Sequence, residues 1–221
     1  MARWLPLVLV AGLAVVPVTA RASAPSLVRR GEPPSEKCPD GGRGIDPLAE
    51  LRQSDLALAS ALHRRAPDWS PEAEANAARV QRLLAEILDY ESIARQALGA
   101  RWDALTPGQR AAFLALFSPL TNRAFVASAE RHVAVTYDSE AISGPEATVV
   151  VTPSRAGGDG PERVEYKLGE RCGRWRIHDV VVDGVSLVDG YREQLARLLR
   201  RGTFDELLAT MRRKLGPTDR Q

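Results

Sequence analysis

Asp179 is the residue of this sequence with the clearest potential for acid–base chemistry, because it stands in an apolar strand-like run beside Val180, Val181 and Val182. A carboxyl group buried in such surroundings can have a raised pKa and act as a general base. The alternative is structural: the carboxylate accepts backbone or arginine hydrogen bonds and holds a bend in the strand. We favour the structural role.

Other catalytic signatures are missing from the sequence. It has no Gly-rich phosphate loop, no zinc-protease helix and no Gly-x-Ser-x-Gly elbow. The three histidines, His63, His132 and His178, fall on different predicted elements, and none lies at metal-ligand spacing from a cysteine. The sequence therefore predicts neither an enzyme nor a metal protein.

Two cysteines, Cys38 and Cys172, are the residues whose chemistry depends on the compartment. In an oxidising compartment they can form a disulfide bond that ties the N-terminal segment to a hairpin. They can equally stay free or cross-link to another chain. We predict the Cys38–Cys172 pairing.

The N-terminus predicts export. Arg3 precedes an apolar run from Trp4 to Val18, and Ala20-Arg21-Ala22 is a small-x-small cleavage pattern, so residues 1–22 read as a signal peptide cleaved after Ala22. Its removal takes away two arginines and no acidic residue, which leaves 28 basic residues against 28 acidic ones. This balance argues against bulk attraction to nucleic acid or to an anionic membrane surface.

Helix start signals divide the chain after a Pro- and Gly-rich leader at 23–45. Caps at Asp46, Ser70, Asp89, Thr106 and Thr203 each precede an amphipathic stripe. The predicted helices run from Pro47 to about Arg65, from Pro71 through Leu88, from Asp89 to Gly99, from Thr106 onward, over 188–199, and from Thr203 to Gly216. Pro119 should kink or split the Thr106 helix before Arg123.

From His132 the apolar period changes to two, which predicts strands. Four strands follow, at 132–137, 149–151, 163–168 and 174–182, with short turn-like joins between them. The change of apolar phase after Ile177 indicates either a bulge near His178 and Asp179 or a strand end that is buried on both sides. Asp183-Gly184 supplies a turn or a second bulge. The pattern predicts an α+β fold: a four-stranded, curved antiparallel meander with one face covered by helices.

The apolar faces of these strands and helices need burial, but periodicity cannot distinguish a filled core from a hollow one. Two motifs address this question. The first is Gly173-x-Trp175-x-Ile177-x-Asp179-Val180-x-Val182-Asp183-Gly184-Val185-Ser186-Leu187, followed by Tyr191-Arg192-x-Gln194. The second is Ala97-Leu98-Gly99-x-x-Trp102, then Leu105-Thr106-Pro107-x-Gln109-Arg110-x-x-Phe113, then Phe117.

These motifs, in this order, resemble the MlaC family of periplasmic phospholipid-binding proteins, which belong to the ABC systems of outer-membrane lipid asymmetry and toluene tolerance. The resemblance spans about Leu83 to Leu215, and Pro119 departs from it. It implies one lipid-binding domain at 46–216 with a tail at 217–221, and an apolar cavity that holds acyl chains. It places the following residues at the cavity wall: Leu84, Leu88, Leu98, Phe113, Phe117, Val149, Val151, Tyr166, Leu168, Val180, Val182, Val185, Leu187, Leu195 and Leu199.

The resemblance also implies a function. The protein would be a soluble, monomeric periplasmic carrier without a cofactor, whose cargo is phospholipid. It would exchange that lipid with an outer-membrane lipoprotein–porin complex and with an inner-membrane ABC transporter bearing a ring of substrate-binding domains. It would bind no nucleic acid.

Three alternatives remain open from the sequence. The cargo could be another lipid, such as a hopanoid or a sterol, because an apolar cavity does not specify its ligand. The chain could be a small cone-shaped α+β enzyme that uses Asp179 as its base. It could also be a structural partner protein with a filled core.

Overall fold

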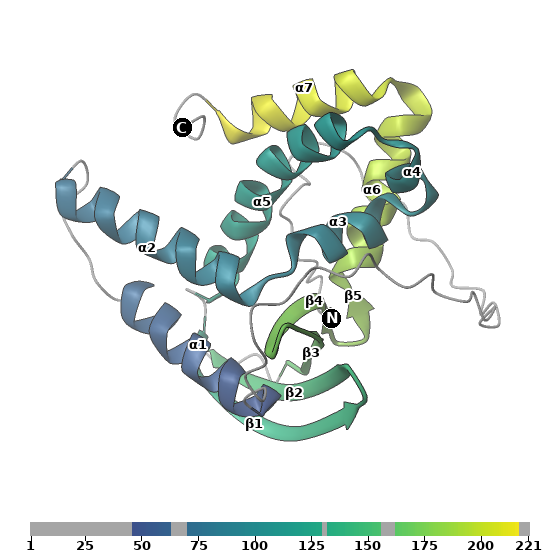
Figure 1. The fold of residues 1–221 in the computed structure, drawn as a ribbon. Coiled ribbons are helices and arrows are strands. Elements are labelled where there is room, and N and C mark those ends of the chain that lie inside the picture. The colour runs from purple at the N-terminus through teal and green to yellow at the C-terminus, as the bar shows by residue number, and fades with distance from the viewer. Residues whose placement is uncertain (1–45, 63–69, 130–131, 156–161, 217–221) are drawn as a thin grey trace.

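A computed structural model describes residues 46–62, 70–129, 132–155 and 162–216, and these form an α+β fold (Figure 1). The helices are α1 (Pro47–Leu62), α2 (Pro71–Ile87), α3 (Tyr90–Leu98), α4 (Ala100–Ala104), α5 (Pro107–Ala129), α6 (Leu187–Arg201) and α7 (Phe204–Leu215). The strands are β1 (His132–Ser143), β2 (Glu146–Arg155), β3 (Val164–Arg171), β4 (Arg174–Val182) and β5 (Val185–Ser186). The predicted α+β class is confirmed.

The signal peptide, leader and tail predicted at 1–22, 23–45 and 217–221, and the last turn predicted for α1, lie outside the described residues. Within the described ranges, no helix is both long enough and apolar enough to cross a membrane.

The sheet is an antiparallel meander with the strand order β1-β2-β3-β4-β5. Two-residue turns join β3 to β4 and β4 to β5, and both residues of each turn have positive φ, at Cys172 (52°) with Gly173 (74°) and at Asp183 (48°) with Gly184 (82°). Such turns match the twist of the strands that they join. The prediction of four strands missed β5, because its two residues are too few to show a period.

The predicted bulge lies at His178. On β4, Ile177 pairs with Leu168 and Asp179 pairs with Lys167, so His178 is the extra residue between two neighbouring pairs. The bulge shifts the phase of the strand by one residue. Ile177 and Val180 are therefore both buried, as the sequence pattern requires.

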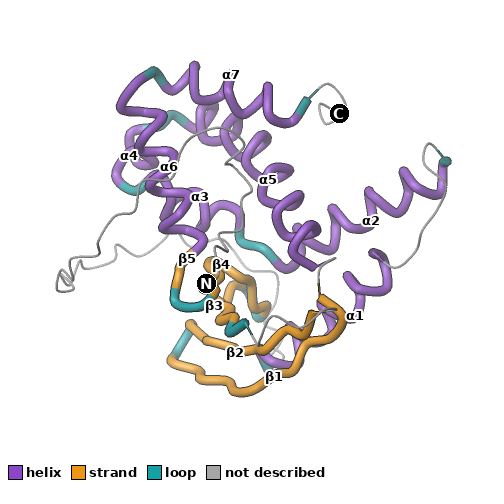
Figure 2. Tube along the Cα trace, turned by 180° about the vertical axis from the view of Figure 1, so that it is seen from behind, coloured by secondary structure: helices purple, strands orange, loops and turns teal. Residues whose placement is uncertain are grey.

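The helices lie to one side of the sheet, as Figures 1 and 2 show from opposite directions. The link between α2 and α3 also covers part of a strand edge. Leu88 forms a parallel bridge with Ile177, and the Asp89 amide donates to the Ile177 carbonyl at 2.9 Å. Because β5 pairs only with Val181 and Val182, this link supplies hydrogen bonds that β5 does not reach.

The predicted caps are confirmed at Ser70, Asp89, Thr106 and Thr203, whose side chains accept amide hydrogen bonds from the first helical turn. The helix α4 was missed. It is five residues long and directly follows Gly99, which ends α3 with a φ of 57°.

Pro119 does not split α5, so the split predicted before Arg123 is wrong, whereas the alternative of a kink stays a prediction. The helix runs unbroken from Pro107 to Ala129. Proline removes one intrahelical donor, but packing holds the helix on both sides of it: Phe117 and Leu120 are 2% and 6% exposed. The Thr121 hydroxyl also donates to the Phe117 carbonyl at 2.9 Å.

Candidate functional site

The predicted cavity wall divides between two apolar clusters. The first cluster lies between the sheet and helices α1 and α2, and consists of Leu51, Leu58, Ala61, Val80, Leu84, Ile87, Leu88, Ala147, Val149, Val151, Val164, Leu168, Trp175, Ile177 and Val180. The second cluster joins helices α3 to α7, and consists of Ile93, Ala94, Ala97, Leu98, Trp102, Phe113, Phe117, Leu120, Val188, Tyr191, Leu195, Leu207, Leu208, Met211 and Leu215. Leu187 packs against both clusters.

The residues predicted to form the cavity wall are distributed over both clusters. The first cluster contains Leu84, Leu88, Val149, Val151, Leu168 and Val180, with Tyr166 and Val182 packed against it. The second contains Leu98, Phe113, Phe117 and Leu195, with Leu199 packed against it. Val185 belongs to neither: it follows the Asp183-Gly184 turn and is 59% exposed. Its place in the predicted wall stays a prediction.

The second cluster is tightly packed around its aromatic rings. Phe113 stacks on Phe117 with ring centroids 5.2 Å apart, and Tyr191 meets Phe117 edge-on at 5.3 Å. A hollow between α5, α6 and α7 is lined by Phe117, Leu120, Thr121, Tyr191, Gln194, Leu195, Leu198, Leu207, Thr210, Met211 and Lys214. It has room for about one water molecule. This hollow does not accommodate a hydrocarbon chain.

Both clusters have partly buried apolar side chains packed against them. Those of the first cluster surround the contact between the sheet and the helices and keep accessible surface there. These are the margin residues: Leu48, Leu62, Leu83, Tyr90, Phe125, Val126, Tyr137, Tyr166, Val182 and Leu187. They come from α1, α2, α3, α5 and α6 and from three strands, so they meet the first cluster from several sides.

A polar group lies beside the first cluster where α1 meets β1. The Tyr137 hydroxyl donates to Asp55 Oδ2, and the Arg52 guanidinium lies 4.8 Å from the centre of the Tyr137 ring. Burial raises the pKa of Asp55 to about 6, and the Tyr137 hydrogen bond offsets part of that rise. Burial, followed by the Asp55 charge, raises the pKa of Tyr137. Sequence reasoning missed Asp55.

A signal for Asp55 was present, because it falls on the apolar stripe of α1, between Leu51 and Leu58. A carboxylate on a buried stripe indicates a specific partner.

A second polar group joins α2, α3 and α5. The Tyr90 hydroxyl donates to Asn122 Oδ1, and Asn122 Nδ2 donates to Gln81 Oε1 at 3.0 Å. Asn122 is 5% exposed. Burial raises the pKa of Tyr90 to about 12, against the effect of its hydrogen bond to Asn122.

Asp179 has the structural role that we favoured. Its Oδ1 accepts from the amides of Val180 (2.8 Å) and Val188 (3.1 Å), and its Oδ2 accepts from the Ser186 hydroxyl at 2.7 Å. Ser186 in turn caps α6 by accepting from the Asp189 amide at 3.1 Å. The carboxylate thus fastens the bulged strand to the start of α6.

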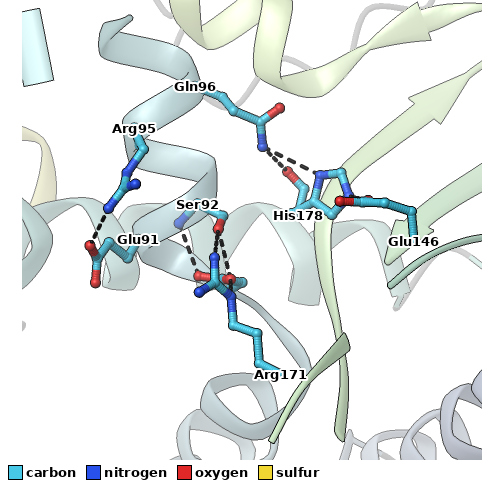
Figure 3. Close-up of polar contacts among 8 residues, drawn as sticks. Glu91, Ser92, Arg95, Gln96, Glu146, Arg171 and His178 are labelled. Carbon is cyan, nitrogen blue, oxygen red and sulfur yellow. Dashed lines mark hydrogen bonds and ion pairs between the residues drawn. The ribbon is translucent and has the colours of Figure 1, made fainter. Parts of the chain in front are cut away.

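The polar side chains around His178 fasten the sheet to α3 (Figure 3). His178 Nε2 lies 2.8 Å from Glu146 Oε2, and Gln96 Nε2 lies 3.3 Å from both His178 Nδ1 and the His178 carbonyl. Nearby, Arg171 pairs with Asp89 at 2.7 Å and donates to the Ser92 hydroxyl at 2.8 Å. These contacts explain His178 without catalysis.

The other candidate groups of the sequence are placed only in part. His132 begins β1, whereas His63 lies outside the described residues. Among the residues that the structure describes, no three His, Cys, Asp or Glu side chains gather as a metal site. Cys172 is exposed in the β3–β4 turn and is disulfide-bonded. Cys38 lies outside the described ranges, so the Cys38–Cys172 pairing stays a prediction.

The sequence and the fold were compared with those of known proteins. No curated protein matches the sequence at a significant level. Among solved structures, the fold matches a phospholipid-binding protein from Ralstonia solanacearum, solved in complex with a phospholipid, with a TM-score of 0.62. The match covers 77% of this chain and 97% of that chain at 19% sequence identity, so the likeness is one of fold. The profile of the MlaC protein family matches residues 56–213, and the chain therefore belongs to the MlaC family.

Proposed function

We propose that this protein is a periplasmic phospholipid carrier that moves lipid between outer- and inner-membrane complexes of an ABC lipid-transport system. Its family and its likeness in fold to a protein that binds a phospholipid support the proposal. No catalytic step is part of it, because the Asp179 carboxylate already accepts three hydrogen bonds.

The margin residues carry the proposal. They are apolar or aromatic side chains that pack against the first cluster and still keep accessible surface. Such surface is available to a hydrocarbon ligand. The second cluster also has partly buried apolar side chains at its edge, but its aromatic rings are stacked and its hollow has room for about one water molecule. We therefore assign the acyl chains to the first cluster and its margin, and assign a packing role to Leu98, Phe113, Phe117, Leu195 and Leu199.

The energetics of such a carrier need no covalent chemistry. Each methylene removed from water contributes about 0.8 kcal/mol, so a long acyl chain crosses an aqueous gap only when it is shielded. Aliphatic side chains such as Val149 and Val182 supply that shielding without recognising a headgroup. We expect weak headgroup selectivity and a strong dependence on chain length.

The proposed partners are those of the family's transport systems: an outer-membrane lipoprotein–porin complex and an inner-membrane ABC transporter with a ring of substrate-binding domains. The signal peptide predicted at 1–22 supports the periplasmic location. The balanced charge of the processed chain supports partner recognition over bulk attraction to anionic lipid.

Two neighbouring valines of β4 provide the test. Val182 packs against the first cluster, and Val181, next in the strand, pairs with Glu165 and faces the opposite side of the sheet. Val182→Trp should fill ligand space and lower the binding of a fluorescent phospholipid by at least about tenfold. Val181→Trp should bind it as the wild type does. Urea unfolding of both variants checks that each is folded.

Equal binding by folded Val182→Trp and wild-type protein would contradict the proposed location. Extraction of lipid from protein purified from a native-like periplasm identifies the cargo. A hopanoid or sterol in place of phospholipid would correct the ligand class, and the absence of any lipid would favour a filled core.

A further inference from the structure

Tyr166 is the margin tyrosine whose hydroxyl makes no hydrogen bond within the described ranges. It lies in the middle of β3, paired with Val149 on β2 and Val180 on β4, both of which are buried. No hydrogen bond joins its hydroxyl to any residue in the described part of the chain, although its side chain is only partly accessible.

The other two tyrosines of the margin differ in this respect. Tyr90 donates to Asn122, and Tyr137 donates to Asp55. Burial is the largest cause of the raised pKa of Tyr166, and the charges of Asp55 and Glu162 add to it. Tyr166 thus presents a neutral hydroxyl beside an apolar cluster, and its acceptor must come from solvent or from a ligand.

The nearby charges restrict what the hydroxyl can bind. The negative charges of Asp55 and Glu162 act on Tyr166. The guanidinium of Arg52 lies over the ring of Tyr137 and not over that of Tyr166. An anionic phosphate is disfavoured beside two carboxylates. A neutral acceptor is compatible with them, and the ester carbonyl at the start of each acyl chain is the neutral acceptor that a diacyl phospholipid carries into an apolar site.

We propose that the Tyr166 hydroxyl donates a hydrogen bond to an acyl-ester carbonyl of the bound lipid, and so makes the protein select ester-linked over ether-linked chains. This inference rests on the proposed function, because it requires a lipid beside the first cluster. It adds a preference for the ester linkage, which apolar side chains alone cannot distinguish from an ether linkage.

Tyr166→Phe tests the inference, with Tyr191→Phe as the matched control. Each substitution removes one tyrosine hydroxyl, but Tyr191 is buried in the second cluster, outside the proposed lipid site. The probes are phosphatidylethanolamine with two ester-linked palmitoyl chains and its diether analogue with chains of equal length. Both are measured by displacement of the same fluorescent phospholipid from delipidated protein.

Wild-type protein and Tyr191→Phe should prefer the diester by about fivefold to tenfold, and Tyr166→Phe should bind the two lipids equally. The urea midpoint of Tyr166→Phe should match or exceed that of the wild type, and the unfolding of Tyr191→Phe is measured alongside to show that the control is folded.

Three results overturn the inference: no diester preference in the wild type, a preference that survives in Tyr166→Phe, or a Tyr166→Phe protein that is destabilised or unfolded. Each of these leaves the proposed function intact if the wild type binds both lipids. Failure of the wild type to bind either lipid overturns the inference and the proposed function together.

Discussion

Carboxylates at two positions show how one residue type serves different ends in this fold. Asp179 accepts three hydrogen bonds at the β4 bulge and so holds α6 against the sheet. Asp55 has one acceptor role, toward Tyr137, and sits beside the first cluster. The Asp179 carboxylate holds structural elements together, whereas the Asp55 carboxyl has its pKa raised to about 6 by burial.

The raised pKa of Asp55 predicts a pH-dependent stability. Its pKa rises from 3.8 to about 6 on folding, so the folded chain binds this proton more tightly than the unfolded chain. The stabilisation is therefore complete below pH 3.8 and is lost as the pH rises through about 6. Asp55→Asn cannot ionise and should be more stable than the wild type at pH 8 by about 3 kcal/mol, a difference that vanishes at low pH.

Urea unfolding from pH 4 to 8 measures this difference, with exposed Asp205→Asn as the control. Tyr137 on β1, Tyr166 on β3 and Arg52 on α1 are the titratable or charged groups around Asp55 and stay unchanged in both variants. A wild type and an Asp55→Asn protein with parallel pH profiles would show that Asp55 titrates normally in the folded chain.

At the scale of elements, α5 connects the two clusters. Phe113 and Phe117 belong to the second cluster, and Phe125 and Val126 belong to the margin of the first. The helix can span both because it continues through Pro119. Proline in a helix interior lacks a donor, so α5 holds its length at a cost in stability.

Restoring that donor should stabilise the protein. Pro119→Ala should raise the free energy of unfolding by about 1 to 2 kcal/mol, since the helix penalty of proline is partly offset by its smaller unfolded-state entropy. Chemical unfolding measures the gain, with the neighbouring Ser118→Ala as the control. A loss of stability in Pro119→Ala would mean that the proline shapes the helix in a way that packing requires.

Sequence patterns predicted elements best where local chemistry decides them. The caps at Ser70, Asp89, Thr106 and Thr203 and the bulge at His178 are determined by neighbours within a few residues. The short α4 and β5 escaped because five and two residues show no period. The split predicted at Pro119 failed because tertiary packing outweighed a local preference.

At the candidate site, contacts between residues far apart in the sequence could not be predicted from local patterns. Periodicity identified apolar faces such as those of Val149 and Phe117, but it could not tell which face each one meets. The fold separates these two residues into different clusters, and it turns Val185 toward solvent. The pairing of Asp55 with Tyr137 spans 82 positions, and no local pattern encodes it.

For the whole molecule, the two apolar clusters hold different elements together. The second cluster binds helices α3 to α7 to one another, and its hollow has room for about one water molecule. The first cluster lies under the sheet, and its margin residues retain accessible surface on several elements. In the proposed carrier, the first cluster exchanges the apolar ligand while the second cluster holds the helices together.

Native mass spectrometry of the processed protein, purified from the periplasm of the cells that make it, tests the central claim most directly. The account predicts a main species heavier than the polypeptide by the mass of one phospholipid. It also predicts that delipidated protein regains this mass on incubation with phospholipid vesicles. A protein that has the bare polypeptide mass both as purified and after that incubation would contradict it.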